Sequence, residues 1–408
     1  MKTTPMTATA LALCSLTLAA CGSGSGSSSG SGSGSGSSTD PIVVGTSLSL
    51  TGPLGVIGTV QKPGYEQLVA DTNAAGGVDV GGKKRKITLN ILDNKSDPNL
   101  ASQQVRELIL KNKANAVLGG CTPPINVPEA LAAEQARTPI VMTCTPVQAF
   151  AGSNKTGWTY AWNFFFDETQ AAQQTIKAVS LTRTNKKIAL FTDTEPDGTV
   201  ERGLFKQAAT DAGFEVVGDY SFPVGTSDYS SFISDARNKG AEIVLGQMIA
   251  PDGIALWKQM KSLGFKPPVA FVAKAASTAA WPKVLGPLAE GSLGQGTWSA
   301  KANLPGTDHL LATIGKTLPQ PDLGLAVNAY AAGQVLMGAL TTAGSTNPDK
   351  LNKVFAATTF DTAVGKIKFD DKHIWPMPQQ ISQFQNGQPV QMIPTAGNQL
   401  QTPNAGLQ

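Results

Sequence analysis

The stretch ITLNILDNKSDPNLASQQVRELILKNKANAVLGG, residues 87–120, decides the fold. Its apolar runs at 87–94 and 116–120 each predict a buried strand. Between them, the pattern of residues 96–113 predicts a helix, with Asp97 as its N-cap and Pro98 in its first turn. A strand, a helix and a second strand in this order are typical of a parallel βαβ unit.

The same alternation continues on both sides of this stretch. Further strands are predicted at 42–50, 139–144, 187–193, 215–222 and 242–248, and further helices at 62–77, 128–137, 167–182, 198–213 and 228–239. The sequence therefore predicts an α/β fold with parallel sheets that are covered by helices on both faces. Because ligands of such sheets bind at the carboxyl ends of the strands, the loops after residues 50, 120, 144, 193, 248 and 273 are the candidate binding loops.

The first 20 residues, MKTTPMTATALALCSLTLAA, have the pattern of a secretory signal peptide. A cation at Lys2 precedes an apolar, threonine-rich run that ends in Ala19 and Ala20. The run is shorter than the roughly 20 residues that a membrane-spanning helix needs. We expect no later stretch to be long and apolar enough to cross a membrane either.

The residues around Cys21 predict how the exported chain is held. Leu18-Ala19-Ala20-Cys21 resembles the lipobox of bacterial lipoproteins, which implies that Cys21 carries lipid at the N-terminus of the mature chain. The alternative is an ordinary signal peptide with an incidental Cys21. Residues 22–38 are only Gly and Ser, and such a coil spans roughly 20 to 25 Å. Residues 21–40 are therefore interpreted as a lipid anchor and tether on the outer face of a cell membrane, extracellular or periplasmic.

Composition excludes several classes of function. The 32 Lys and Arg nearly balance the 29 Asp and Glu, and no charge run indicates a nucleic-acid partner. His309 and His373 are the only histidines, and neither has a metal-ligand or catalytic-triad context. No glycine-rich phosphate loop follows the first strand. We therefore expect no enzyme activity, no cofactor and no metal site.

Two cysteines remain in the mature domain if Cys14 leaves with the signal peptide and Cys21 is lipidated. Cys121 and Cys144 then face an oxidising compartment, which favours one disulfide. Two buried free thiols are the alternative. About 370 residues follow the tether, which is more than one small core needs and suits two domains.

Successive blocks of this chain resemble one known family in their order and spacing. They are SLTGPLGVIG, ADTNAAGGVDVGGKKRKITL, SDPNLASQQVRELI, DAGFEVVGDYSFPVGTSDYSSFISDARNKGAEIVLGQ and VGKIKFDD. Together they are similar to the type I periplasmic solute-binding proteins of ABC importers, in the branched-chain amino acid (Leu/Ile/Val-binding) group, here in lipoprotein form.

The resemblance implies two Rossmann-like α/β lobes with parallel central sheets, joined by a three-crossing hinge. By analogy the crossings lie near residues 162, 297 and 371. Lobe 1 then comprises residues 41–162 and 297–370, and lobe 2 comprises 163–296 and 371–408.

The resemblance also implies where a ligand carboxylate is held in lobe 1. The matching positions are Thr122, in GGCTPP, and Cys144-Thr145, in VMTCTP, where hydroxyls and loop amides at helix N-termini form an anion site. The alternative is that Thr122 and Thr145 only cap helices. The family's usual bridge joins the position of Cys121 to that of Ser96, so a pairing with Cys144 across adjacent strands departs from it.

Other departures concern the ammonium end of an amino acid. Lys274 stands where relatives carry an acidic residue, and Ile57, Asp197 and Ile249 stand where relatives carry a tyrosine. A lysine repels an ammonium group but attracts a second anion, unless Lys274 points into solvent. We therefore expect a carboxylate-bearing ligand without a conventional ammonium group.

Five aromatic residues lie within residues 160–166 at the first crossing. Trp162 and Phe165 are the candidates to line a pocket for a flat or apolar ligand body. Packing in the hinge and core is the alternative.

These observations predict a lipid-anchored solute-binding protein that captures a small carboxylate-bearing ligand, an amino acid or a related organic or aromatic acid. The expected partners are the permease and ATPase of an ABC importer, and the expected state is a monomer. The alternative function is a sensor subunit that presents its ligand to a membrane receptor or kinase.

Overall fold

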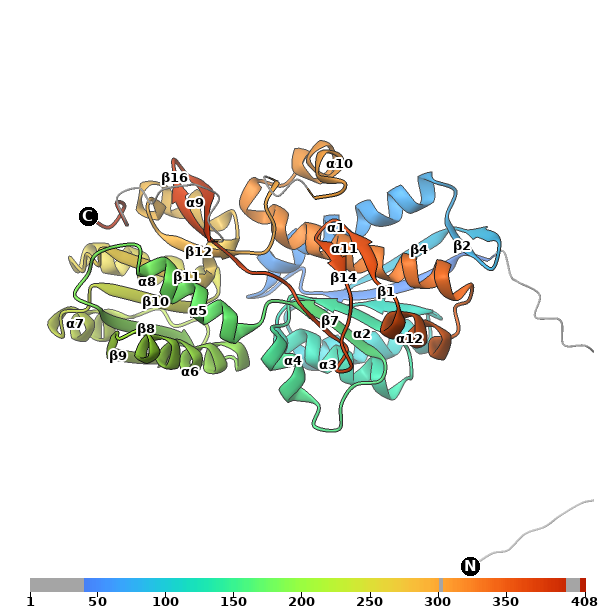
Figure 1. Cartoon of the computed structure of the whole chain (residues 1–408), viewed down its shortest axis with the longest axis horizontal. Coiled ribbons are helices and arrows are strands. Elements are labelled where there is room, and N and C mark those ends of the chain that lie inside the picture. Colours follow the sequence, from blue (N-terminus) through green and yellow to red (C-terminus); the bar gives the residue numbers. More distant parts are fainter. Residues whose placement is uncertain (1–39, 301–303, 394–403) are drawn as a thin grey trace, which may run out of the picture. The chain divides into compact units, whose positions relative to one another are not determined.

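The computed structural model describes residues 40–300, 304–393 and 404–408. The predicted signal peptide, Cys21 and the tether up to residue 39 lie outside the described residues. The described chain builds two large sheets, each covered by helices on both faces (Figure 1). This confirms the predicted α/β class with two lobes.

The first sheet has the order β15-β7-β6-β5-β1-β4, and all its strands run parallel. Its strands are β1 (Ile42–Leu48), β4 (Ile87–Asp93), β5 (Ala116–Leu118), β6 (Ile140–Thr143), β7 (Ala161–Phe165) and β15 (Ile374–Pro376). Its helices are α1 (Gly55–Ala74), α2 (Pro98–Leu110), α3 (Pro123–Gln135), α4 (Val147–Ser153), α10 (Thr307–Ala312), α11 (Gln320–Ala343) and α12 (Pro348–Ala357). Two small hairpins accompany it, β2 (Val78–Val80) with β3 (Lys83–Arg85) and β13 (Phe360–Thr362) with β14 (Gly365–Ile367).

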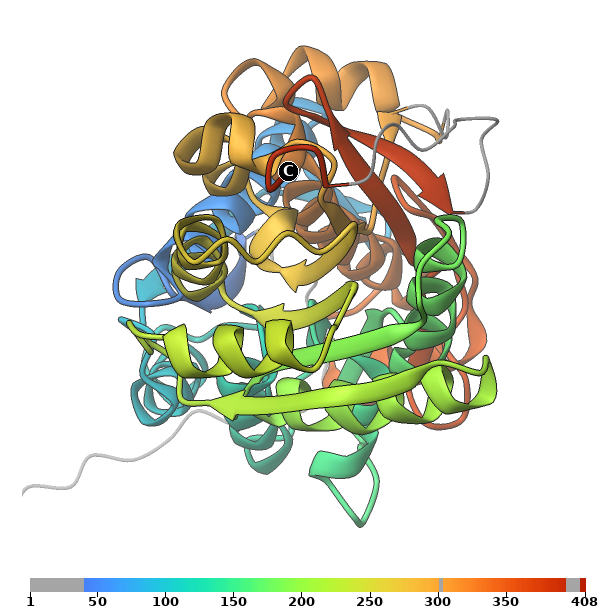
Figure 2. The same cartoon turned by 90° about the vertical axis from the view of Figure 1, so that its left-hand side faces the viewer.

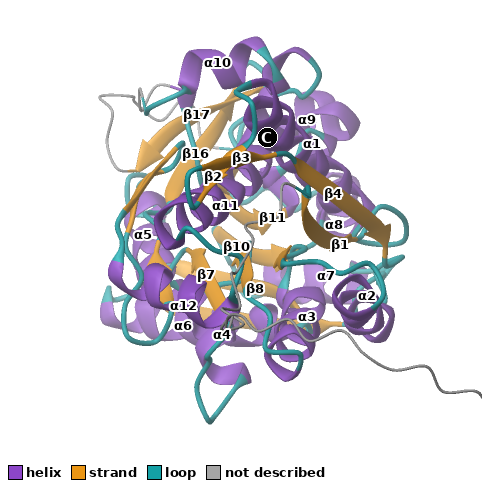
Figure 3. Ribbon diagram, turned by 90° about the vertical axis from the view of Figure 1, so that its right-hand side faces the viewer, coloured by secondary structure: helices purple, strands orange, loops and turns teal. Residues whose placement is uncertain are grey.

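The strands of the first sheet bury apolar side chains on both faces. On β5, Leu118 joins the core with α1 and α11, while Val117 joins the core with α2 and α3. β6 alternates in the same way through Val141 and Ile140. Figure 3 shows α2 and α3 near β1 and β4 of this sheet. Continuous apolar strands of this kind are typical of parallel sheets between two helix layers.

The second sheet has the order β17-β16-β12-β11-β10-β8-β9. Its strands are β8 (Lys187–Asp193), β9 (Glu215–Phe222), β10 (Ile243–Met248), β11 (Val269–Lys274), β12 (Leu293–Gly296), β16 (Gln380–Gln385) and β17 (Gln388–Ile393). Its helices are α5 (Glu168–Val179), α6 (Pro196–Asp211), α7 (Ser230–Asn238), α8 (Ala250–Ser262) and α9 (Ala280–Leu285), with single 3-10 turns such as η1 (Ala275–Ser277). The strands β9, β8, β10, β11 and β12 run parallel to one another.

The edge of the second sheet is antiparallel. β16 pairs antiparallel with β12, and β17 pairs antiparallel with β16. In Figure 2 this red hairpin lies beside the C-terminal residues 404–408. There Asn404 donates from Nδ2 to the Pro267 carbonyl at 2.8 Å, and Leu407 is fully buried. β16 and β17 therefore form the edge of the second sheet, and residues 404–408 pack against the same lobe.

Two of the predicted crossings are displaced in the structure. Residue 162 lies inside β7, and β15 still pairs with β7 after residue 371. The chain leaves the first sheet after Phe165 and again after Pro376, whereas the crossing near residue 297 follows β12 directly. These two crossings therefore lie a few residues after the predicted positions, and Met377 N still donates to Phe165 O at 2.8 Å. The three residues of β15 are too few to carry a periodic signal in the sequence.

The predicted elements differ from the observed ones mainly at α1. The sequence places this helix at 62–77, with Pro63 near its start, but it begins at Gly55 and Pro63 lies inside it. Gly64 allows the close approach of α11, because a Cβ there would lie 2.0 Å from the Ala326 carbonyl oxygen. The predicted cap of α2 is confirmed, since Asp97 accepts hydrogen bonds from Asn99 N and Leu100 N.

The expectation that no later segment has the length and apolarity of a membrane span was wrong for α11. Gln320–Ala343 has 24 residues and is long and apolar enough, by length and composition alone, to cross a membrane. Its side chains, including Leu323, Val327, Val335 and Leu336, are buried in the core of the first lobe. α11 is therefore a core helix, apolar on more than one face because several elements pack around it.

Candidate functional site

A cavity of about 1110 Å³, including its part open to solvent, lies at the carboxyl ends of strands from both sheets. The sequence-predicted residues Ile57, Thr122, Cys144, Phe165, Asp197 and Lys274 line it. Residues that sequence reasoning missed also line it, among them Gln247, Ser277, Thr278, Gln295, Trp298, Leu325, Gln380, Ser382 and Gln391. The carboxyl end of β10 and the segments that follow β5, β6, β8 and β11 therefore border the cavity, as the parallel-sheet rule predicts.

Cys121 and Cys144 form a disulfide at the ends of β5 and β6, with their Cα atoms 5.0 Å apart. Thr122 N also donates a hydrogen bond to Cys144 O at 3.3 Å. Both Thr122 (φ 73°) and Cys144 (φ 69°) adopt the left-handed backbone region that residues with a Cβ rarely occupy. Such conformations persist only where the surroundings hold them, and they gather at binding sites.

Thr122 is the N-cap residue of α3, yet its hydroxyl makes no capping hydrogen bond. Thr122 Oγ1 is buried and has no hydrogen-bond partner in the described chain. The hydroxyl is therefore available to a ligand, and capping is not its role.

The expected amide cradle at the N-terminus of α3 is not formed. Pro123 and Pro124 have no N–H, and the amides of Ile125 and Asn126 both donate to the carbonyl oxygen of Thr122. After β6, Pro146 likewise has no N–H, and Val147 N donates to Phe166 O at 3.1 Å. Prolines at these positions therefore remove some of the helix-terminal amides that the prediction assigned to an anion.

A buried polar cluster holds the backbone that leads into Thr122. Gln61 donates from Nε2 to Gly120 O at 2.7 Å, and Tyr65 donates from its hydroxyl to Gly119 O at 2.7 Å. Gly120 N donates to Glu129 Oε2 at 2.7 Å. Burial raises the pKa of the Glu129 carboxyl to about 8, although the hydrogen bond from Gly120 lowers it. Three side chains from two helices therefore fix the loop after β5.

Lys274 ends β11 and has φ 52°, again in the left-handed region. Its Nζ lies 2.7 Å from Asp197 Oδ2 and 3.8 Å from Asp193 Oδ2, and only 12% of the side chain is exposed. Burial acts to lower the pKa of Lys274, but the carboxylates of Asp197 and Asp193 outweigh it and hold that pKa above its ordinary value. The Lys274 side chain therefore points into the cavity wall, not into solvent.

The carboxyls around Lys274 are themselves desolvated. Burial raises the pKa of Asp193 to about 7, against the opposing charge of Lys274. Burial and the charge of Glu168 raise the pKa of Glu201 well above its ordinary value. Gln247 donates from Nε2 to Asp197 Oδ2 at 3.0 Å, which leaves Asp197 Oδ1 and Gln247 Oε1 buried without a hydrogen-bond partner.

Thr145, Trp162 and Ile249 do not line the main cavity. Thr145 is fully buried and accepts a hydrogen bond from Asn126 Nδ2 at 2.7 Å. Trp162 stacks on His373 with ring centroids 3.6 Å apart and donates to Asn352 Oδ1 at 3.0 Å, inside the first core. The side chains of Thr145 and Trp162 therefore face the interior of the first lobe and not the cavity.

Ile249 lines a smaller neighbouring cavity. Ile57, Lys274 and Thr278 border both cavities, and Pro53, Val56, Ala250 and Pro251 complete the small one. Ile249 therefore lies at the rim of the site and not on the wall of the main cavity.

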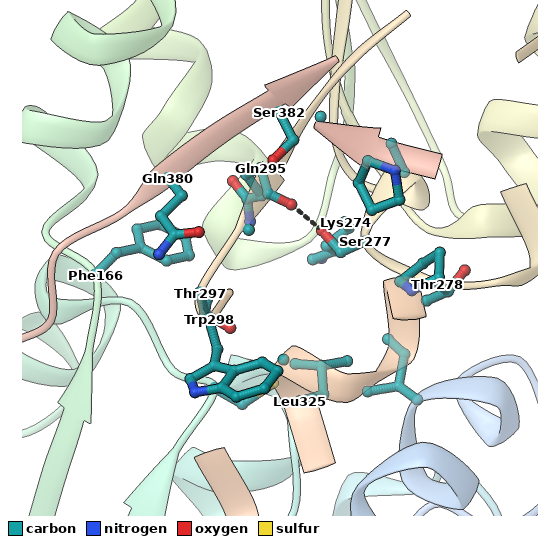
Figure 4. A pocket seen from close by; sticks show the side chains of 18 of the residues that line it. Phe166, Lys274, Ser277, Thr278, Gln295, Thr297, Trp298, Leu325, Gln380 and Ser382 are labelled. Atoms are coloured by element: carbon teal, nitrogen blue, oxygen red, sulfur yellow. Dashed lines mark hydrogen bonds between the residues drawn. The ribbon is translucent and has the colours of Figure 1, made fainter. Parts of the chain in front are cut away.

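The wall from the second sheet is rich in amides and hydroxyls (Figure 4). Gln295 Oε1 accepts from Gln379 Nε2 at 2.8 Å, and Ser277 donates to Gln295 O at 2.9 Å. Across the cavity lie Trp298 and Leu325. The only sequence signal for Gln247 and Gln295 is that each polar amide stands near the carboxyl end of an apolar strand.

Comparisons with known proteins agree with this geometry. The family model described as periplasmic binding protein matches residues 41–388. The chain is 24% identical to "Leu/Ile/Val-binding protein homolog 3" of Brucella melitensis over 332 residues, which cover 81% of this chain and 87% of that protein.

Two solved structures show the same fold. A leucine-binding protein from Thermotoga maritima aligns with a TM-score of 0.76 and 20% identity over 86% of this chain and 97% of that one. A solute-binding protein of an ABC transporter from R. palustris, in complex with 4-hydroxybenzoate, aligns with a TM-score of 0.74 and 19% identity, over 86% and 95% of the two chains.

Proposed function

Because the chain belongs to the periplasmic binding protein family, we propose that it captures a small organic solute outside the cytoplasm and delivers it to an ABC importer. The observation that supports this most directly is that one cavity is bordered both by Thr122 and Cys144 of the first lobe and by Asp197, Gln247 and Lys274 of the second. A solute bound there contacts both lobes. It therefore favours the arrangement in which both walls reach it.

The proposed work is capture and hand-over, without a chemical step. The chain passes between the two sheets three times, after β7, after β12 and after β15. Three short crossings suit hinge motion between two rigid lobes. The proposed partners that receive the solute are a permease and its ATPase. We propose that they recognise the protein when its two lobes are closed.

The proposed location follows from the N-terminal sequence. Residues 1–20 act as an export signal, Cys21 carries the lipid, and the Gly/Ser run tethers a monomeric domain to the outer face of the membrane. A test is metabolic labelling with a palmitate analogue. The wild-type protein should take up label and float with membranes, and Cys21→Ser should do neither.

The proposed size of the solute is inferred from similar proteins. One similar structure is that of a leucine-binding protein and another holds 4-hydroxybenzoate. We propose a molecule in this size range, and the carboxylate-bearing class that the sequence predicts belongs in the first panel tested. A ligand at a hundred times its dissociation constant adds about 2.7 kcal/mol to the free energy of unfolding, which a thermal-shift assay resolves.

Uptake by the source cells tests the importer role. Deleting the gene should abolish uptake of the solute that binds, and the wild-type gene should restore it. Trp298→Ala, on the cavity wall, should fail to restore it, whereas Trp375→Ala, in β15 and outside the cavity, should succeed. Unchanged uptake of every bound solute after deletion would instead support the sensor function.

A further inference from the structure

We infer that the cavity selects an uncharged ligand, with an amide or polyhydroxyl head against the second sheet and an apolar body against the disulfide and Trp298. This inference rests on the proposed function and names the class of solute. An uncharged ligand replaces the carboxylate-bearing ligand that the sequence predicts. The reason is that Lys274 pairs with Asp197 in the structure, so its charge is already balanced.

The first step concerns charge. Lys274 and Asp197 are the only charged residues on the cavity wall in the described chain, and they pair with each other at 2.7 Å. Asp193, 3.8 Å from the same Nζ, adds a second carboxyl behind the pair. A carboxylate ligand would lose its hydration and meet no uncompensated cation, while an ammonium group would meet the ammonium of Lys274. Both charged classes are therefore disfavoured.

The second step concerns the other wall. Pro123, Pro124 and Pro146 have no N–H to offer a carboxylate, and the amides of Ile125, Asn126 and Val147 donate within the protein. Thr122 Oγ1 is a buried hydroxyl without a hydrogen-bond partner in the described chain. A hydroxyl suffices to orient a neutral ligand, but alone it does not replace the hydration of an anion.

The third step concerns hydrogen bonding. Asp197 Oδ1 and Gln247 Oε1 are buried acceptors without a partner on the second-lobe wall. An unpaired buried acceptor costs free energy, so a ligand that donates hydrogen bonds there offsets part of that cost. Gln380 and Ser382 add groups of a type that both donates and accepts. Amide and hydroxyl groups match such a wall.

The fourth step concerns the ligand body. Ile57, the Cys121–Cys144 disulfide, Phe165, Leu325 and Trp298 form the apolar side of the cavity. Figure 4 shows the Trp298 ring and Leu325 on the side opposite Gln380 and Ser382. The two sides differ in polarity, so they orient the ligand with its head toward the second sheet.

Matched compounds test the inference on the purified full chain by isothermal titration calorimetry. On a phenyl body the set is benzamide, phenyl β-glucoside, benzoate and benzylamine; on a branched body it is isovaleramide, isovalerate and isoamylamine. At least one uncharged member should bind about tenfold or more tightly than its charged counterparts. Comparing benzamide with phenyl β-glucoside shows whether the cavity prefers an amide or a polyhydroxyl head group.

The remaining outcomes count against the inference. Tighter binding of benzoate, isovalerate or either amine overturns the uncharged class but leaves solute capture intact. If no member of either set binds, the inference fails. If, in addition, the gene deletion changes no solute uptake, the proposed function fails with it.

A gain of binding gives a second test that misfolding cannot imitate. Asp197→Asn removes the main partner of Lys274 and should strengthen benzoate binding about tenfold or more, since the lysine charge becomes available. The matched control Asp235→Asn changes an exposed ion pair with Lys239 and should leave benzoate binding unchanged. Unchanged benzoate binding in a folded Asp197→Asn protein overturns the charge-balance step.

Discussion

Asp197 and Lys274 meet across the end of the second sheet, with Oδ2 and Nζ 2.7 Å apart and the two side chains 2% and 12% exposed. They are 77 positions apart in sequence, 274 minus 197, and reach each other because β11 and β8 flank β10. A pair held this far from water depends on both of its members.

Lys274→Met should therefore lower the free energy of unfolding by about 3 to 5 kcal/mol, because it leaves buried carboxyls without a counter-charge. Urea unfolding followed by tryptophan fluorescence measures the change. Lys239→Met, which breaks the exposed pair with Asp235, should cost less than about 1 kcal/mol. Equal costs for the two variants would show that the Lys274 pair is hydrated.

The Cys121–Cys144 disulfide closes a loop with a sequence separation of 23. The chain-entropy model assigns such a loop about 3 kcal/mol of stability. Replacing both cysteines by serine should lower the free energy of unfolding by this amount. Reductant should then shift the unfolding midpoint of the wild-type protein but not that of the variant, and an identical response of both would contradict the bridge.

Glu129 should make stability fall as pH rises from 5 to 8. Its folded pKa is raised to about 8, so in this range the folded state binds more protons than the unfolded state, and stability is lost as the pH approaches the folded pKa. Glu129→Gln keeps an acceptor for Gly120 N and cannot ionise. The decline between pH 5 and 8 should therefore be smaller in the variant, by about 3 kcal/mol. Parallel stability curves for the two proteins would refute the assignment.

Two tryptophans should respond in opposite ways. Trp162→Ala should lower the free energy of unfolding by about 3 to 5 kcal/mol, because the ring is fully packed between His373 and Phe355. Its ligand affinity, measured below the unfolding transition, should stay within about twofold. Trp298→Ala should weaken binding by about tenfold or more. A binding loss in the Trp162 variant equal to that of Trp298→Ala would contradict this division.

The fold could be predicted from sequence because its signals are local. Apolar strands such as β8 and β10, caps such as Asp97 and the regular alternation with helices are each readable within a short window. β15 could not be predicted, because its three residues gain their strand conformation only by pairing with β7. The chain therefore leaves the first sheet for the last time after Pro376, a few residues beyond the predicted crossing near 371.

The candidate site could be predicted only in part. Phe165 and Trp162 lie on the same strand, but Phe165 stands at its carboxyl end and Trp162 near its start, a distinction that needs the strand boundaries. Lys274 and Asp197 were recognised as two separate departures from the related proteins. The two side chains form an ion pair, so each balances the charge that the other introduces. This contact depends on the order of the strands and cannot be predicted from the sequence.

The antiparallel edge of the second sheet has a consequence for the nascent chain. Gln380, Ser382 and Gln391 belong to β16 and β17, whereas β12, to which this hairpin attaches, ends at Gly296. A polypeptide still on the ribosome, with residues up to about 370 released, has most of the cavity but not this side of it, and β12 is an unpaired edge. The side of the cavity that β16 and β17 supply is therefore completed only after these strands are made, well after the residues that line its other sides.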